Sequence, residues 1–507
     1  MGIPSFYRHL CRRFPHIISR TAGPTSDWLC LDFNCAMYFV LHGMPPYEGS
    51  VAGAAKWEAK LRKGICDYLE EIVAVAKPTA GVYVACDGVV CAAKRRQQRL
   101  RRFKSPWLTA SEDSIQGIFK ERWDQNALTP GTAFMARLGK DLVATGARLG
   151  LPVIVSTTEE PGEGEHKLMA HMRQLPDGLS CTIYGLDADL LLLAMLLVVE
   201  KGGSVHLLRE EQEFEKRSGG GGWRTVDIRG LMGHLFERTS NGATLASKTR
   251  DFVAGMSLLG NDFLPKSLTH TVRDDGIPDL IRALDKRIWS AGHNLVVDGR
   301  IQSRHLTAII ESFASEEENA MIAACVSALK QRGRPVEDNA LAIWSAQPAQ
   351  WATILRLYNS GLRPNWKAIY ESWRGADDPD GSEYLKGVAW VFDYYSGKPV
   401  DLGWAYEPHL PPLWSRLKPS QEVAVAPPPL TYITYLPAWI HLLAVLPAAS
   451  ANKLLKKTQL GLLQSHPLYW PTEFSLFDIG VSQIWQTEAV IPIIPEELLR
   501  QLESPKI

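Results

Sequence analysis

The sequence predicts an α/β protein built on a parallel sheet, with a mainly helical second region after it. Four short apolar runs of strand character, each followed by a helical pattern, lie at residues 28–31, 81–86, 152–155 and 181–186. This alternation is typical of parallel strands that are joined by helices. The second observation is that acidic residues follow each of the four runs. We place the α/β region at 1–285 and the mainly helical region, which we expect to pack against it, at 286–507.

Composition limits the class of protein. The chain has 507 residues, 46% of them apolar and 22% charged, with a formal net charge of zero. This length predicts two packed units, and the composition argues against disorder. Any nucleic-acid site must therefore be a local basic patch, because the charge of the whole molecule is balanced.

Cysteine spacing and apolar runs indicate the compartment. The eight cysteines form no CxxC pair, so we expect buried free thiols in a reducing compartment. The N-terminal stretch MGIPSFYRHLCRRF lacks the apolar core of a secretory signal, and the longest apolar stretch, 430–450, is interrupted by prolines. We expect a monomeric cytoplasmic protein without a membrane span, and leave a nuclear location open.

The acids can be followed strand by strand. The first run ends at Asp32 and the second, GVYVAC, at Asp87; the third leads into PGEGEHKLM, and the fourth into YGLDAD. A further acid follows the helical run 251–259, in GNDFLP. Because parallel strands end at one edge of a sheet, these acids are expected to converge there. The seven are Asp32, Asp87, Glu163, Glu165, Asp187, Asp189 and Asp262.

A single acid after a strand is most simply a helix N-cap or a solvated loop residue. The set is different, because like charges held within a few ångströms stay ionised only when a cation neutralises them. Oxygen-rich sites suit Mg²⁺ or Mn²⁺, and two such ions about 3.5–4 Å apart form the clamp used for phosphodiester cleavage. Gly162 and Gly164 would let the backbone bring Glu163 and Glu165 to these two ions.

A basic helix follows Asp87. The stretch KRRQQRLRRFK, residues 94–104, has seven basic residues in eleven. At helical spacing one face carries Lys94, Gln98, Arg101 and Arg102. Taken alone, the run could be a solvated helix or a nuclear-import patch. Its position close to a predicted metal ligand favours a phosphate-binding face, since arginine binds phosphate through two hydrogen bonds.

Aromatic residues supply the other half of single-strand binding. Tyr38 lies six residues after Asp32, on the helix expected there, and the stretch 387–412 is rich in Trp and Tyr. Most of these rings are expected in the core.

These stretches together resemble the XRN family of 5′→3′ exoribonucleases. The matching segments run in order: MGIPSFYRHL, LDFN, CDGVVCAAKRRQQRLRRFK, PGEGEHKLM, YGLDADLLLL, LLGNDFLP, YLKGVAWVFDYY, GWAYEPH, LLAVLP and YWPTEF. The resemblance implies a PIN/flap-endonuclease-like fold and processive hydrolysis of single-stranded RNA with a 5′-monophosphate to nucleoside 5′-monophosphates, with two Mg²⁺ or Mn²⁺. It implies a metal site at the seven acids, a 5′-phosphate pocket at Lys94, Gln98, Arg101 and Arg102, and base stacking on Tyr38 and Trp390.

The chain departs from the family in two ways. Tyr38 stands where the family usually has His, and Cys91-Ala92 where Pro-Arg is common. We also expect a compact form of the family without the C-terminal accessory domains of the large cytoplasmic enzyme, which would fit a viral or divergent protist source.

Two other functions stay open. The first is a flap-endonuclease-like DNA 5′ nuclease, but such enzymes carry a Gly-rich helix-hairpin motif after the last acid, which FLPKSLTHTVRDDGIPDLI lacks. The second is a non-catalytic protein that binds RNA 5′ ends. Such a protein would be free to lose acids, and all seven are present.

Overall fold

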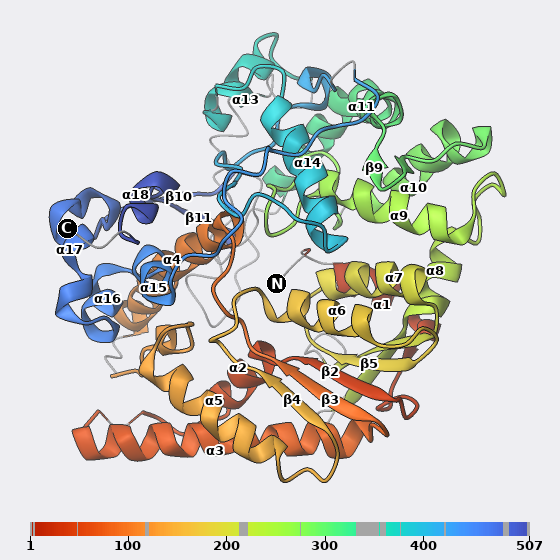
Figure 1. Ribbon diagram of the computed structural model, residues 1–507. Helices are drawn as coiled ribbons and strands as arrows, with labels where there is room; N and C mark the ends of the chain where they lie inside the picture. The colour runs from red at the N-terminus through yellow and green to blue at the C-terminus, as the bar shows by residue number, and fades with distance from the viewer. Residues whose placement is uncertain are drawn as a thin grey trace.

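A seven-stranded mixed sheet forms the centre of the first half of the chain, in a computed structural model (Figure 1). The structure describes residues 3, 6–47, 49–116, 121–211, 222–273, 275–330, 354, 361–375, 377–419, 422–479 and 486–503. The strand order is β1-β7-β6-β5-β2-β3-β4. The strands are β1 (Ile18–Ser19), β2 (Trp28–Asp32), β3 (Gly81–Ala85), β4 (Val153–Ser156), β5 (Ser180–Tyr184), β6 (Ser204–Glu210) and β7 (Trp223–Asp227).

The parallel part of this sheet confirms the predicted fold class. Strands β6, β5, β2, β3 and β4 are parallel neighbours, and four of them are the runs that the sequence indicates. The sequence did not predict β6, β7 or β1, and β7 pairs antiparallel with both neighbours. The glycine run 219–222 lies mostly outside the described residues, but Glu211 N donates to Gly222 O at its end.

Helices cover both faces of the sheet, because successive strand residues point to opposite sides. Leu29 and Leu31 pack into one hydrophobic cluster, and Cys30 packs into the other. The first face is covered by α2 (Asn34–His42), α3 (Val51–Ala76) and α5 (Ala133–Gly146). The second is covered by α1 (Phe6–Arg13), α6 (Gly164–Gln174), α7 (Asp189–Lys201), α8 (Ile228–Phe236) and α9 (Leu245–Met256). Figure 1 shows α3 and α5 on one side and α6 and α7 on the other.

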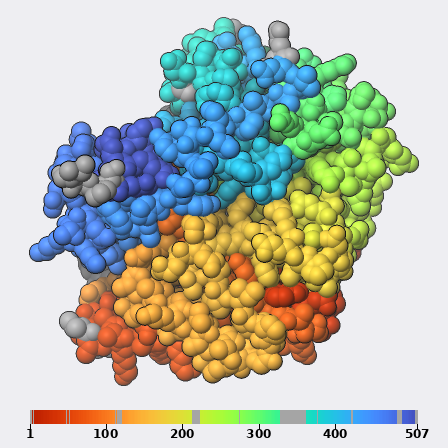
Figure 2. Space-filling view, in the orientation of Figure 1, coloured from red at the N-terminus to blue at the C-terminus, as the bar shows by residue number. Residues whose placement is uncertain are grey.

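The later part of the chain is mainly helical. Its helices are α10 (Gly276–Arg287), α11 (Ser303–Lys330), α13 (Trp366–Arg374), α14 (Ser382–Tyr395), α15 (Ala438–Val445), α16 (Ala448–Leu454), α17 (Gly461–Ser465) and α18 (Glu496–Arg500). Short strands are β8 (Val296–Val297), β9 (Arg300–Ile301), β10 (Ser475–Phe477) and β11 (Glu488–Val490). Helix α10 crosses residue 285, so the division at that residue stays a prediction. In the space-filling view the blue C-terminal part lies directly against the yellow and orange sheet region (Figure 2).

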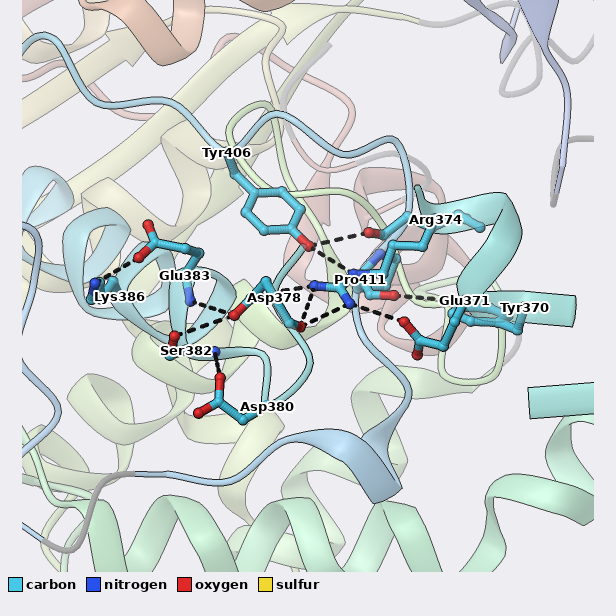
Figure 3. Close-up of polar contacts among 11 residues, drawn as sticks. Tyr370, Glu371, Arg374, Asp378, Asp380, Ser382, Glu383, Lys386, Tyr406 and Pro411 are labelled. Carbon is cyan, nitrogen blue, oxygen red and sulfur yellow. Dashed lines mark hydrogen bonds and ion pairs between the residues drawn. The ribbon is translucent and has the colours of Figure 1, made fainter. Parts of the chain in front are cut away.

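A buried arginine joins α13 to α14. Arg374 Nη2 lies 3.0 Å from Asp378 Oδ2, and its Nη1 lies 3.0 Å from Glu371 Oε2. Tyr406 also contacts this guanidinium, at 3.4 Å (Figure 3). The network holds the turn after α13 and places α14 against α9.

The remaining global expectations concern thiols and membranes. All eight cysteines are free thiols, six of them buried, as predicted. Among the described residues, every helix is too short or too polar to cross a membrane.

Candidate metal centre and phosphate-binding helix

The predicted acids lie at one edge of the sheet. Asp32 is the last residue of β2, Asp87 follows β3, and Asp187 follows β5. Asp189 is the first residue of α7. Since β2 lies between β5 and β3, its neighbours bring these acids to one place. Glu163 precedes α6 and Glu165 is its second residue.

Two glycines let the loop before α6 approach this edge. Gly164 N donates to Asp87 Oδ1 at 2.7 Å, and a Cβ on Gly164 would lie 2.6 Å from Asp32 Oδ1. A side chain at this position would therefore collide with a predicted metal ligand. Gly162 has φ +103°, a conformation that L side chains rarely adopt. The structure thus explains both glycines of PGEGEHKLM.

Lys94 enters the acidic cluster from α4 (Ala92–Gln116). Its Nζ lies 2.6 Å from Glu163 Oε2 and 2.8 Å from Asp262 Oδ2. Burial would lower the pKa of Lys94, but Asp262, Glu163 and other acids outweigh burial and raise it. The expectation for Lys94 was a phosphate contact, whereas in this structure it neutralises acids.

Burial makes the cluster costly to ionise. Burial is the largest cause that raises the pKa of four acids, and repulsion from neighbouring carboxylates raises each pKa further. The four are Asp32, Glu163, Glu165 and Asp189. The pKa of Asp189 rises to about 7. Both carboxylate oxygens of Asp189 and Oε1 of Glu165 are buried and have no hydrogen-bond partner among the described residues.

These unpartnered oxygens fit a divalent cation. Hard carboxylate ligands suit Mg²⁺ or Mn²⁺, and a bound cation would remove the cost of burying several negative charges. Glu163, Glu165 and His166 can each offer a ligand atom, all within 4.8 Å of one another. Burial lowers the pKa of His166 to about 3, so its imidazole is neutral and able to accept.

The other predicted phosphate ligands lie further along α4. Gln98 and Arg102 are buried, and Gln98 Oε1 and Arg102 Nη1 have no hydrogen-bond partner within the described part of the chain. Burial lowers the pKa of Arg102 to about 10, although the Tyr38 and Asp87 charges oppose the shift. Arg102 therefore lies close to both the predicted stacking residue and the acids. Arg101 and Tyr38 are half-buried.

Trp390 requires a correction. Its side chain is 0% exposed, and Nε1 donates to Asp401 O at 2.9 Å. The ring packs between Phe263, at 5.3 Å between centroids, and Tyr394, at 4.9 Å. A ring without an exposed face cannot stack on a base, so in this structure Trp390 is a core residue that supports the site from behind.

Two polar residues that sequence reasoning missed orient the acids. Asn34 Nδ2 donates to Asp87 Oδ2 at 2.6 Å, and Asp87 N donates to Asn34 Oδ1 at 3.1 Å. Tyr394 donates its hydroxyl to Glu163 Oε1 at 2.8 Å. Asn34 lies two residues after β2, in LDFN, which was a usable signal. Tyr394 had no such signal, because it lies 231 residues from Glu163.

Comparison with known proteins identifies the first part of the chain. Residues 1–211 match the family model described as the XRN 5′-3′ exonuclease N-terminus. The chain is 26% identical to human 5′-3′ exoribonuclease 1 over 598 residues, covering 99% of this chain and 34% of the human protein. It is 35% identical to 5′-3′ exoribonuclease 1 of Saccharomyces cerevisiae over 218 residues, covering 38% of this chain and 14% of the yeast protein.

A third relative is 5′-3′ exoribonuclease 2 of Yarrowia lipolytica, 28% identical over 403 residues, with 64% of this chain and 39% of that protein covered. The chain thus spans about a third of the length of the human relative, and less of the yeast one. The family match covers β2 to β6 and the residues from Asp32 to Asp189 that gather at the sheet edge. Residues 1–211 therefore belong to the XRN 5′-3′ exonuclease N-terminal family.

Proposed function

We propose that this protein is a metal-dependent 5′→3′ exoribonuclease. Its substrate would be single-stranded RNA with a 5′-monophosphate, which it would degrade processively to nucleoside 5′-monophosphates. The observation that carries the proposal is that one helix, α4, serves two adjoining sites. Lys94 contacts the acids, while Arg102, two turns later, is buried with an Nη1 that has no hydrogen-bond partner in the described part of the chain. A phosphate at Arg102 would therefore lie a short distance from the acids.

The reaction is hydrolysis of a phosphodiester. The oxygen of water bonds to phosphorus, the bond to the 3′ oxygen breaks, and that oxygen takes up a proton. Two divalent cations held by the seven acids would activate the water and stabilise the leaving oxygen. The released nucleotide keeps its 5′-phosphate, and the shortened RNA starts with a new one.

The protein's own side chains would bind and orient the RNA. Gln98, Arg101 and Arg102 hold the terminal phosphate, and Tyr38, close to Arg102, stacks on the first base. A triphosphate or a cap exceeds the donors available in this buried pocket, so monophosphate ends are preferred. Asn34 keeps the Asp87 carboxylate oriented toward the acids. Each cleavage regenerates the group that the pocket binds, which supports processivity.

The test uses 5′-labelled single-stranded RNAs with a monophosphate, hydroxyl, triphosphate or cap, with a matched DNA strand. The Asp187→Ala/Asp189→Ala double variant removes two predicted ligands, and Glu159→Gln, an exposed acid nearby, is the matched control. We expect mononucleotides from monophosphorylated RNA, with wild type and control, and none with EDTA or the double variant. Equal degradation of capped and monophosphorylated RNA would contradict the proposed pocket.

Other results would point to the alternatives. Internal cuts or activity on flapped DNA would indicate a flap-endonuclease-like enzyme, and binding without cleavage would indicate an RNA-end-binding protein. We further propose a monomeric, cytoplasmic protein, to be tested by light scattering and by fractionation of the source cells.

A further inference from the structure

A cavity of about 410 Å³ lies along the first two turns of α4. Three arginines of the helix line it: Arg95, Arg96 and Arg99. Because an α-helix turns by about 100° per residue, Arg96 lies about 200° around α4 from Lys94. The other walls are the stretches 401–407 and 431–432 and the C-terminal stretch 493–499, which includes α18. In Figure 1 α4 runs alongside α15 and β11 here.

Two of the four acids that line this cavity have partners within the protein. Glu496 pairs with Arg95 and, at 2.9 Å, with Arg500 Nε. Asp401 is buried, and its Oδ1 accepts from the backbone N–H groups of Gly403 at 3.2 Å and Tyr432 at 2.7 Å. These carboxylates are therefore engaged by the protein itself.

Two of these arginines contact no carboxylate among the described residues. Arg99 is 2% exposed, and it donates to backbone carbonyls alone, those of Pro492, Ala444 and Tyr469, among the residues the structure describes. Burial lowers the pKa of Arg99 to about 9. Such a guanidinium is costly to bury without a negative charge nearby.

Arg96 is the second. Its Nη2 donates to Glu407 O at 2.6 Å, and its Nε is buried with no hydrogen-bond partner in the described chain. Glu488, whose charge acts on Arg96, has its carboxylate 2.6 Å from His409 Nδ1. Glu407, whose charge also acts on Arg96, and Glu497 are exposed at the surface. The buried side of the cavity therefore carries the arginines, with an Arg96 N–H donor that has no partner among the described residues, and these two acids lie at its exposed side.

Aromatic and apolar side chains complete the lining. Trp404 and Tyr432 are half-buried, and Ile494 and Leu499 form an apolar part of the wall. A volume of about 410 Å³ is enough for a small organic ligand. Guanidinium groups select a phosphate, and aromatic rings select a planar base. These two chemistries occur together in a nucleotide.

We propose that this cavity binds a nucleoside 5′-monophosphate, with its phosphate at Arg96 and its base against Trp404 and Tyr432. Arg96 lies about 120° around α4 from Arg102, and the acids do not line the cavity, so the site goes beyond the proposed function. Its occupant shares a helix with the candidate active site, which gives a mononucleotide a physical route to influence that site.

The experiment is titration calorimetry of the full chain with AMP in EDTA. All proteins carry Arg102→Gln, so that the other predicted phosphate face is weakened. We expect one AMP per chain, and adenosine and inorganic phosphate each bind at least about tenfold more weakly, because each lacks one half of the contacts. Adding Arg96→Gln weakens AMP binding at least about tenfold, and adding Thr431→Trp, which fills the cavity from an exposed position, abolishes it.

The matched control is Arg282→Gln, which removes an exposed arginine far along the chain on α10 and should leave AMP binding unchanged. Circular dichroism and melting temperature show whether each variant folds; if Arg96→Gln does not, Thr431→Trp decides. No AMP binding, binding that survives both changes, or phosphate binding as tight as AMP would overturn the proposal. Hydrolysis of monophosphorylated RNA by the wild type is measured separately, so this result and the proposed function can fail independently.

Discussion

Asp189 allows a quantitative test of the acidic cluster. Its side chain is 0% exposed and both oxygens lack partners among the described residues, so Asp189→Asn removes a buried charge with little change of shape. The folded protein has a pKa of about 7 for this group against an ordinary 3.8. That gap corresponds to about 4 kcal/mol of lost stability once the group is ionised. Because the titrations of neighbouring acids are coupled, we expect Asp189→Asn alone to raise the free energy of unfolding by about 2 kcal/mol.

The direction of the pH effect follows from proton binding. Between pH 4 and pH 7 the folded state holds the Asp189 proton and the unfolded state does not, so stability falls as pH rises through this range. In EDTA, wild type should lose more stability than Asp189→Asn over this interval and be the less stable protein at pH 8. Mg²⁺ should reverse the order, since binding at 100 times Kd adds about 2.7 kcal/mol to the wild type.

The assay is urea unfolding at pH 5 and pH 8, with EDTA or Mg²⁺, and Glu159→Gln is the exposed-acid control. The control should follow the wild type under all four conditions. Identical pH profiles for wild type and Asp189→Asn in EDTA would refute the argument that burial and repulsion act on this carboxylate. Failure of Mg²⁺ to stabilise the wild type would refute the convergence of the acids on a cation.

Three other substitutions test particular contacts. Lys94→Met leaves Glu163 and Asp262 without the ammonium group that neutralises them, so the free energy of unfolding in urea with EDTA should fall by about 3–5 kcal/mol, and Mg²⁺ should reduce this loss. An unchanged unfolding midpoint would contradict the pairing. Arg102→Ala should lower kcat/KM at least about tenfold for monophosphorylated RNA and leave 5′-hydroxyl RNA unaffected, whereas an equal loss on both would exclude a phosphate contact. Trp390→Phe should destabilise the fold by about 1 kcal/mol, because the buried Asp401 O loses its donor, without weakening RNA binding in a filter assay. Weaker RNA binding at unchanged stability would restore a stacking role.

The fold class and the places where the acids gather could be predicted from the sequence. Parallel strands end at one edge, so an acid after each apolar run, such as Asp32 after β2, is assigned to that edge by local pattern alone. The antiparallel strand β7 was missed, because nothing within Trp223–Asp227 distinguishes an edge partner of β6 from loop sequence. Roles that depend on long-range contacts were also missed, because local sequence does not show which residues meet. The hydrogen bond from Tyr394 to Glu163 is one example.

Lys94 and Trp390 show where residue type and spacing stop being informative. Spacing correctly puts Lys94 on one face of α4 with Gln98, but a helical face does not say which acid it meets, and the contact with Asp262 spans 168 residues. For Trp390 the sequence gives an aromatic ring on a helix, and only tertiary packing against Phe263 decides that the ring is covered. Both outcomes are set by distant parts of the chain.

The placement of Lys94 also explains how so many acids can fold together. Burying several carboxylates without compensation would oppose folding, and protonation alone would keep the site neutral only at low pH. Lys94 supplies a covalently attached cation that contacts Glu163 and Asp262, acids from separate segments, before any ion is needed. It neutralises part of the charge and leaves Asp189 and Glu165 with unpartnered oxygens. The chain can thus reach its folded state with the ligand oxygens already gathered, and the remaining electrostatic cost becomes the driving force for binding divalent cations.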